Sequence, residues 1–142
     1  MKLLYKNVMI FFVILFSFGL FFLHTANAGT LSCSVTTAAA CTGTVIYRMS
    51  GATNAHAELP SQATAAYNSN VVCCSGVTGL GTACTGTFAT ALKLSGVTNA
   101  HVEQNAQVNY ANSACMSVPS GGTVSVGYQA TNCTGFDTTL GS

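Results

Sequence analysis

One nine-residue segment occurs twice in this 142-residue chain, and its repetition constrains the fold more than any other feature of the sequence. The segment reads SGATNAHAE at residues 50–58 and SGVTNAHVE at residues 95–103. A Cys-Thr-Gly tripeptide begins at Cys41, Cys84 and Cys133. Because short repeats bury their apolar faces against their neighbours, the sequence predicts tandem units that pack on one another.

Two complete units and the start of a third are predicted, at about residues 41–74, 84–115 and from 133 onward. The connectors between the units differ in length, as loops between repeats usually do. The third unit stops at Ser142, which takes the place of Ser50 and Ser95 in the other two units. We therefore expect the natural chain to continue with a third SGxTNAH-like segment and a further cysteine.

Residues 1–28 have the pattern of a signal peptide. Two lysines precede the apolar run 8–23, and Ala26-Asn27-Ala28 supplies the small residues that signal peptidase recognises. The run is shorter than the ~20 apolar residues that a membrane-spanning helix needs. The sequence therefore predicts cleavage before Gly29 and export of the repeat-built β domain 29–142. We expect the protein to be extracellular or at the cell surface, with no membrane attachment after cleavage.

All seven cysteines follow the leader, and in an exported chain they are expected to form disulfides. They are Cys33, Cys41, Cys73, Cys74, Cys84, Cys115 and Cys133. Zinc is the alternative, but the chain has no C-x2-C pair or finger-like spacing. Neighbours on a strand face opposite ways, so Cys73 and Cys74 are not expected to bond each other. One of these two is expected to lack a partner within residues 29–142, and the connectivity is left open.

Alternating apolar and polar residues predict β-strands in the mature chain. The alternation covers residues 45–49, 88–94, 101–110 and 123–128. Gly, Ser, Thr and Asn clusters separate these runs, and no sustained helical period follows the leader. The predicted fold class is all-β, as an antiparallel β-sandwich stapled by disulfides and built from tandem repeat units. A propeller is less suitable, because two units and a fraction do not close a ring.

The repeated motif contains every histidine and every glutamate of the mature chain. Residues two apart on a strand share a face, so His56 should converge with Glu58, and His101 with Glu103. This pattern suggests a divalent cation site. Its candidate ligands are Asn54, His56, Glu58, Asn99, His101 and Glu103. Carboxylate and amide oxygens suit calcium, whereas direct imidazole ligands suit zinc.

With one carboxylate per unit, such a cation site would have to be shared between units or subunits. The alternative is a repeated structural turn, in which the asparagine adopts the left-handed conformation. In that case histidine and glutamate pair with each other or with the cations Arg48 and Lys93.

Charge and residue pattern exclude several other function classes. The mature chain has only five charged side chains, which are Arg48, Glu58, Lys93, Glu103 and Asp137. A net charge near zero does not favour nucleic acid or an anionic membrane as a partner. No Ser/His/Asp or Cys/His arrangement stands apart from the repeat, so we do not expect an enzyme.

The leader, the SGxTNAHxE repeats, the Cys-Cys pair and the Cys-Thr-Gly starts resemble a group of largely uncharacterised exported bacterial proteins. This resemblance implies a secreted or surface β-protein of a structural kind, with no established active site. A nearly uncharged surface lacks the repulsion that keeps proteins monomeric, and open strand edges invite further strands. The sequence therefore predicts a subunit of an extracellular fibre or surface layer, with copies of itself as partners. The alternative is a monomeric secreted β module that binds a metal or another ligand.

Overall fold

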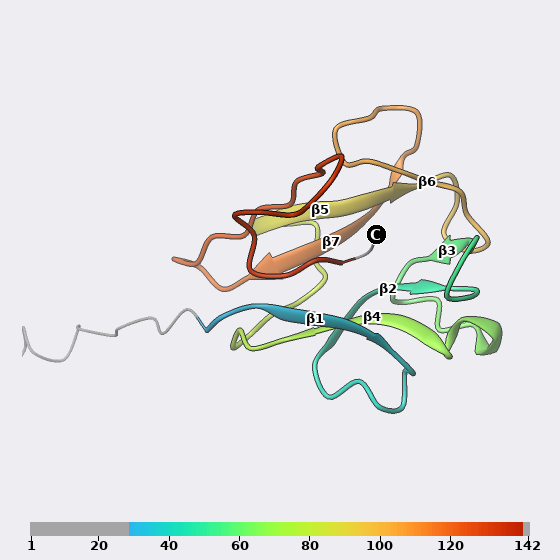
Figure 1. Ribbon diagram of the computed structural model, residues 1–142, viewed down its shortest axis with the longest axis horizontal. Coiled ribbons are helices and arrows are strands. Elements are labelled where there is room, and N and C mark those ends of the chain that lie inside the picture. Colours follow the sequence, from blue (N-terminus) through green and yellow to red (C-terminus); the bar gives the residue numbers. More distant parts are fainter. Residues whose placement is uncertain (1–28, 141–142) are drawn as a thin grey trace, which may run out of the picture.

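The computed structural model describes residues 29–140, which form two β-sheets (Figure 1). The elements in chain order are β1 (Ser32–Thr36), β2 (Thr44–Met49), β3 (Ala57–Glu58), the 3-10 helix η2 (Ala65–Tyr67), β4 (Asn70–Ser75), β5 (Thr87–Leu94), β6 (Val102–Glu103) and β7 (Asn112–Val118). All strand pairs are antiparallel, which confirms the predicted all-β class with antiparallel sheets. The predicted signal peptide lies outside the described residues.

The strands of the two sheets follow the same arrangement. The first sheet has the order β1-β4-β2-β3 and the second β6-β5-β7, so β3-β2-β4 corresponds to β6-β5-β7. The register shifts once in each middle strand, between Val45 and Tyr47 in β2 and between Thr90 and Leu92 in β5. Such an irregularity bends the strand and increases its twist. Both long strands therefore curve at the same point of their sheet.

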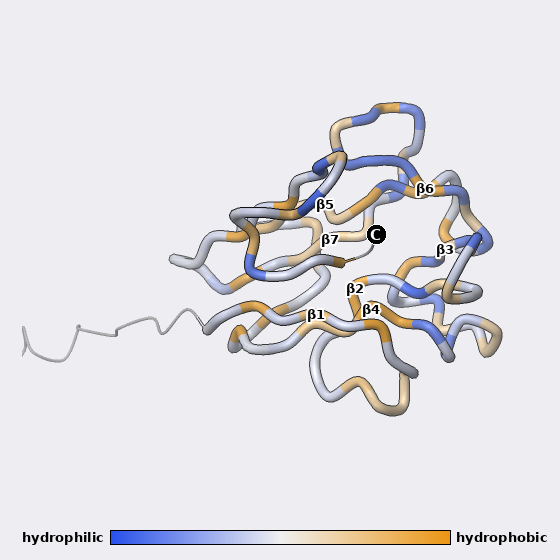
Figure 2. The backbone as a smooth tube through the Cα atoms, in the orientation of Figure 1, coloured by the Kyte–Doolittle hydropathy of each residue, from blue (hydrophilic) through white to orange (hydrophobic). Residues whose placement is uncertain are grey.

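Two of the predicted strands are wrong: one is much shorter than predicted and the other is absent. Within 101–110 only β6 is a strand, and the residues after it form a loop that Figure 2 shows as mostly hydrophilic at the top of the view. Val108, which the alternation assigns to an apolar face, is 86% exposed. Residues 123–128 are not in a strand, although Val124 and Val126 pack against the core. Their alternation therefore reflects valines that pack against the core from an irregular segment, and not a strand paired in a sheet.

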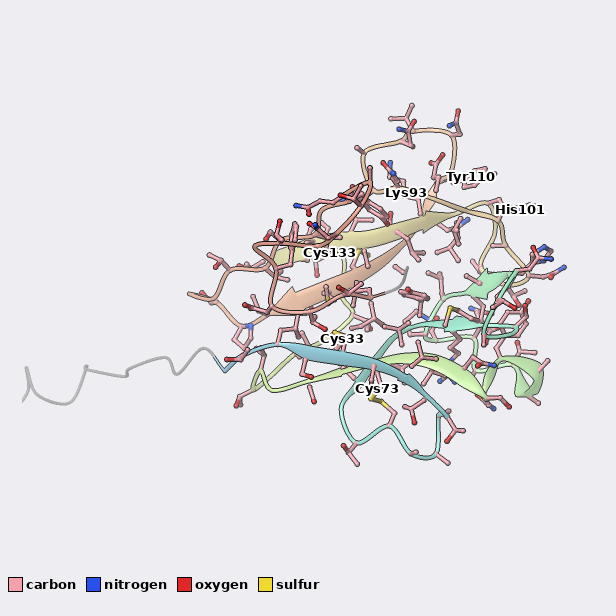
Figure 3. All side chains as sticks on the ribbon, viewed as in Figure 1. Cys33, Cys73, Lys93, His101, Tyr110 and Cys133 are labelled. Atoms are coloured by element: carbon pink, nitrogen blue, oxygen red, sulfur yellow. A yellow bond between two sulfur atoms is a disulfide. The ribbon has the colours of Figure 1, made fainter. Side chains whose placement is uncertain are left out.

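Cys73 and Cys74 both form disulfides, so the expectation that one of them lacks a partner is wrong. Cys33 bonds Cys74, and Cys41 bonds Cys73. The two neighbours point to opposite faces of β4, and each face offers a different partner. Figure 3 shows the Cys73 sulfur on the side of β4 turned away from the second sheet. The free cysteine is Cys133, which is exposed.

The second sheet has its own disulfide, between Cys84 and Cys115. It joins the segment before β5 to β7, as the Cys41–Cys73 bond joins the segment before β2 to β4. The counterpart of Cys115 is therefore Cys73, although equal spacing along the chain relates Cys115 to Cys74.

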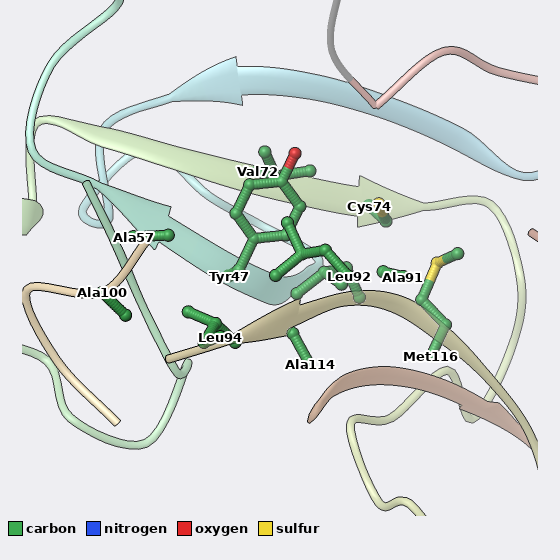
Figure 4. Packing of buried hydrophobic residues seen from close by; sticks show 11 residues of the cluster. Tyr47, Ala57, Val72, Cys74, Ala91, Leu92, Leu94, Ala100, Ala114 and Met116 are labelled. Atoms are coloured by element: carbon green, nitrogen blue, oxygen red, sulfur yellow. The ribbon is translucent and has the colours of Figure 1, made fainter. Parts of the chain in front are cut away.

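Both sheets contribute side chains to one hydrophobic core, shown in Figure 4. Its buried residues are Ile46, Tyr47, Ala57, Val72, Cys74, Ala91, Leu92, Leu94, Ala100, Ala114 and Met116. Leu94 is fully buried, and burial of a side chain of this size contributes about 1.5–3 kcal/mol to the stability of the fold. The core includes Ala57 and Ala100, which belong to the two repeated motifs, so the motifs lie where the two sheets meet.

Candidate functional site

Each SGxTNAH segment is closed by its serine and its histidine. The backbone N–H of Ser50 donates to the carbonyl oxygen of His56, and the N–H of His56 donates to Ser50 Oγ, both at 2.9 Å. Ser95 and His101 form the same two bonds at 3.0 Å. The motif therefore folds in the same way in both places, and the recurrence of its serine has a structural reason.

The asparagine of each motif adopts a left-handed backbone conformation. The φ angle is 46° at Asn54 and 49° at Asn99. Asparagine is one of the few residues other than glycine that tolerate this region. Both asparagines therefore occupy the position that the structural-turn alternative gives them.

Glu58 is fully buried, and both of its carboxylate oxygens are engaged. Oε1 accepts a hydrogen bond from the backbone N–H of Thr64 at 2.9 Å, and Oε2 accepts one from Thr98 Oγ1 at 3.0 Å. The first bond closes the loop that follows β3. The second reaches the other motif, so Glu58 connects the two.

Glu103 closes the corresponding loop after β6. Its Oε1 accepts a hydrogen bond from the backbone N–H of Tyr110 at 2.8 Å, and its Oε2 accepts one from Asn109 Nδ2 at 3.0 Å. Both partners lie in its own unit. The two glutamates therefore share one role within their units, and Glu58 has an additional role between them.

The cations upstream of the motifs hold the same loops. Arg48 Nε donates to the carbonyl oxygen of Pro60 at 3.1 Å, and Lys93 Nζ donates to that of Gln107. Each cation lies opposite its unit's glutamate in the strand register. In each unit the cation and the glutamate thus both form hydrogen bonds to the loop that follows the short strand, β3 or β6.

The two motifs meet through their main chains. Ala57 and Ala100 exchange backbone hydrogen bonds, with N···O distances of 3.0 Å from Ala57 and 2.9 Å from Ala100. The N–H of Leu59 donates to the carbonyl oxygen of Val97 at 2.9 Å. The segment before β6 therefore extends the β3 edge of the first sheet, and we call this contact the junction.

Polar side chains cluster beside the junction. His56 Nδ1 lies 2.6 Å from Asn99 Oδ1, which also accepts a hydrogen bond from Tyr67 Oη at 3.3 Å. The rings of His56 and His101 lie with their centroids 4.8 Å apart. Figure 3 labels His101 at the end of the molecule where β3 and β6 lie.

The structure brings together only some of the predicted site residues. His56, Asn99 and His101 are neighbours, and Glu58 is connected to them through the second motif. Asn54 and Glu103 form no hydrogen bond to this cluster within residues 29–140. The sequence does not identify Ala57, Ala100 or Tyr67 as part of this cluster. Alanine gives no chemical signal in a sequence, and only the pairing of the motifs could have identified Tyr67.

Within residues 29–140, no group of three or more His, Cys, Asp and Glu side chains is arranged to hold a metal ion. The oxygens of both glutamates already accept hydrogen bonds from protein groups. As metal ligands, two adjacent imidazole rings suit zinc better than calcium. Calcium or zinc at the motif stays a prediction.

An open depression of about 1080 Å³ lies beneath the C-terminal segment 119–140. Tyr47 and Tyr128 line it, and their hydroxyl groups donate to the carbonyl oxygens of Leu140 and Ala91. Burial, with a smaller contribution from Tyr128, raises the pKa of Tyr47 to about 12. Burial also raises the pKa of Tyr128. Both phenols are therefore protonated at neutral pH and act as donors that hold the segment in place.

Comparisons with protein-family models, with curated proteins and with solved structures found no match. The resemblance to exported bacterial repeat proteins therefore stays a prediction. None of the helices in residues 29–140 is long and apolar enough to cross a membrane.

Proposed function

We propose that the chain is a secreted structural protein whose copies associate into an extracellular fibre or surface layer. The observation that carries this proposal is the junction, where the main chain of one motif extends the sheet edge of the other unit. Pairing through backbone groups depends little on side-chain identity, and proteins use it to add strands from other chains. The same kind of backbone pairing at a sheet edge that connects the two motifs within one chain could therefore connect two chains.

We also propose that the two sheets form a β-sandwich of two repeated units. Three correspondences support this: the strand order, the register shift in the middle strand, and the disulfide between the preceding segment and the paired strand. The shared core between the sheets supports the sandwich. A protein built in this way presents similar surfaces at regular intervals, which is what an ordered assembly needs.

The covalent framework and the charge support the proposed location outside the cell. Three disulfides are expected to persist in an oxidising compartment. The mature chain has a net charge close to zero, so copies experience little mutual repulsion.

The test is the mass of purified, oxidised residues 29–142 in solution as the protein concentration rises. Size-exclusion chromatography with light scattering should show a mass that increases with concentration, and electron microscopy should show filaments or layers. High salt should not dissolve the assembly, because its contacts are between backbone dipoles rather than between charges. A single monomeric species at every concentration, without particles in the microscope, would contradict the proposal.

The second candidate function is a monomeric module that binds a metal, and the adjacent rings of His56 and His101 favour it. Elemental analysis and calorimetric titration with zinc and with calcium test it. If it holds, a monomer binds zinc, and His101→Ala abolishes the binding without loss of the fold. If a chelator changes neither the melting temperature nor the assembly, the motif is structural only.

A further inference from the structure

Within residues 29–140 the junction is formed once, and each of the two segments that form it has a counterpart in the other motif that makes no such contact. Ala57 lies opposite Met49 in the register of β2 and β3, and Val102 lies opposite Leu94 in that of β5 and β6. Ala57 and Val102 therefore hold the same position in their sheets. In the same way Ala55 in the first motif corresponds to Ala100 in the second.

The backbone of Val102 faces the open edge of its sheet. Residues of an antiparallel pair point their N–H and C=O groups alternately to the partner and away from it. Ser95 and His101 bond each other across the β5–β6 pair, so the next residue, Val102, points its groups outward. At Ala57 the outward groups bond Ala100. Within residues 29–140, no segment outside the sheet forms a backbone hydrogen bond with Val102.

Side-chain exposure shows the same difference. Ala57 is 2% exposed beneath the second motif, whereas Val102 is 50% exposed. At the other end of the contact, Ala100 is 1% exposed, whereas its counterpart Ala55 is partly exposed. One copy of the chain therefore presents both an uncovered β6 edge and an uncovered first motif.

The opposite edge of the first sheet is less available. Thr138 Oγ1 accepts a hydrogen bond from the backbone N–H of Cys33 at 3.1 Å and lies 3.5 Å from the Cys33 carbonyl oxygen. This contact occupies the outward groups at the centre of β1. An approaching chain finds free backbone groups at β6 rather than at β1.

We propose that copies of this chain join head to tail through a second junction, in which Val102 of one copy pairs with Ala55 of the next. The proposal rests on the proposed self-assembly and names its two surfaces. Repetition of the internal contact brings Asn54 of the next copy to His101, as Asn99 lies against His56. It likewise brings Thr53 to Glu103, as Thr98 lies against Glu58. The two surfaces differ, so the contact propagates into a filament unless its rotation closes a ring.

Cross-linking between two singly substituted chains tests the pairing. Both chains carry Cys133→Ser to remove the free thiol, and one carries Ala55→Cys while the other carries Val102→Cys. Mild oxidation of the mixture should give a covalent heterodimer. The matched control replaces Val102→Cys by Val108→Cys, at an exposed site in the loop after β6, and should give no such product. A dominant Val102→Cys homodimer would show symmetric edge pairing and overturn the proposal.

The second experiment introduces a charge at the β6 edge and measures assembly. Val102→Lys should leave the melting temperature within a few degrees of that of the native chain and abolish assembly at concentrations where the native chain assembles, because a lysine blocks strand addition. Val108→Lys adds the same charge at an 86% exposed site and should assemble normally. If the native chain assembles and both lysine variants do so equally, the head-to-tail contact is wrong while self-assembly stands. If the native chain never assembles, the proposed function itself fails.

Discussion

The buried carboxylate of Glu58 accepts a hydrogen bond from the hydroxyl group of Thr98 at 3.0 Å, across the boundary between the two motifs. Its counterpart Glu103 bonds only to its own loop. The same residue type at the same place in the motif therefore has a different environment in each unit. The difference arises because, among the described residues 29–140, the second motif covers the β3 edge and no segment covers the β6 edge.

Truncation of these glutamates should have unequal effects on stability. Glu58→Ala leaves the N–H of Thr64 without its buried partner, and we expect a loss of about 1–3 kcal/mol in the free energy of unfolding. Glu103→Ala removes a more exposed carboxylate, and we expect the smaller loss. Urea unfolding of the two variants measures the difference. Glu58→Gln is the control, since its amide can accept from Thr64 and donate to Thr98. Equal losses for the two alanine variants would contradict this assignment.

Glycine substitutions should separate the backbone role of the asparagines from their side-chain role. Within residues 29–140 no hydrogen bond of the Asn54 side chain is formed, so Asn54→Gly should be nearly neutral for the stability of the single chain. Asn54→Ala should cost ~1 kcal/mol, because alanine lacks the short polar side chain that lets asparagine tolerate this region. Asn99→Gly should destabilise the fold, since Asn99 Oδ1 also bonds His56 and Tyr67. Thermal melts of the three variants provide the comparison, and a neutral Asn99→Gly would show that these contacts contribute nothing.

Peptide mapping under non-reducing conditions should find three bridges and one alkylated thiol, at Cys133. The expected pairs are Cys33–Cys74, Cys41–Cys73 and Cys84–Cys115. Removal of the Cys84–Cys115 pair by serine substitution should cost about 3–4 kcal/mol by loop entropy. Cys133→Ser should leave the melting temperature unchanged. A protein with seven free thiols would contradict both the fold and the expected export.

Stability should fall at alkaline pH through Tyr47. Its pKa in the fold is raised from 10.0 to about 12, so its contribution to stability is complete below pH 10 and is lost as the pH rises towards 12. Tyr47→Phe removes the hydroxyl group and should flatten this decline, although it also loses the bond to Leu140. Denaturant unfolding at several pH values, with ultraviolet absorbance to follow tyrosinate, measures both. Recovery of the fold after return to neutral pH controls for disulfide damage, and an unchanged alkaline decline in Tyr47→Phe would refute the assignment.

The sequence predicts the local part of this fold well. The alternation in 45–49 and 88–94 marks β2 and β5, and the repeated TNAH segment predicts a turn with asparagine in the left-handed conformation. These features depend on residues close together in the chain. The boundaries of the shorter elements were not predictable, because the alternation in 101–110 continues past the point where β6 loses its neighbour.

The correspondence between the cysteines of the two sheets follows from strand pairing and not from their intervals along the sequence. Equal intervals of sequence relate Cys33, Cys74 and Cys115, yet in the sheets Cys73 lies opposite Val45 as Cys115 lies opposite Thr90. The loops between the strands differ in length, so counting residues along the chain misaligns the units by one position. That single position decides which face of the strand a cysteine occupies.

The junction could not be predicted from residue types. Ala57 and Ala100 contribute only backbone groups to it, and every residue except proline has those groups. The prediction placed histidine and glutamate on one strand face within each unit, and a cation site shared between units or subunits. In the structure the two histidines lie next to each other, and each glutamate accepts a hydrogen bond from its own loop, while Glu58 also accepts one from Thr98 of the other motif. The motif recurs because both copies need the same turn, and the contact between the copies follows from their packing.

The adjacent cysteines of β4 have a consequence for resistance to proteolysis. A cut anywhere between residues 42 and 72 leaves one piece with Cys33 and Cys41 and the other with Cys73 and Cys74, and two disulfides still hold the pieces together. A cut between residues 85 and 114 leaves its pieces joined by the third disulfide. A protein cut once at the exposed tip of each motif therefore stays in one covalent piece until its disulfides are reduced.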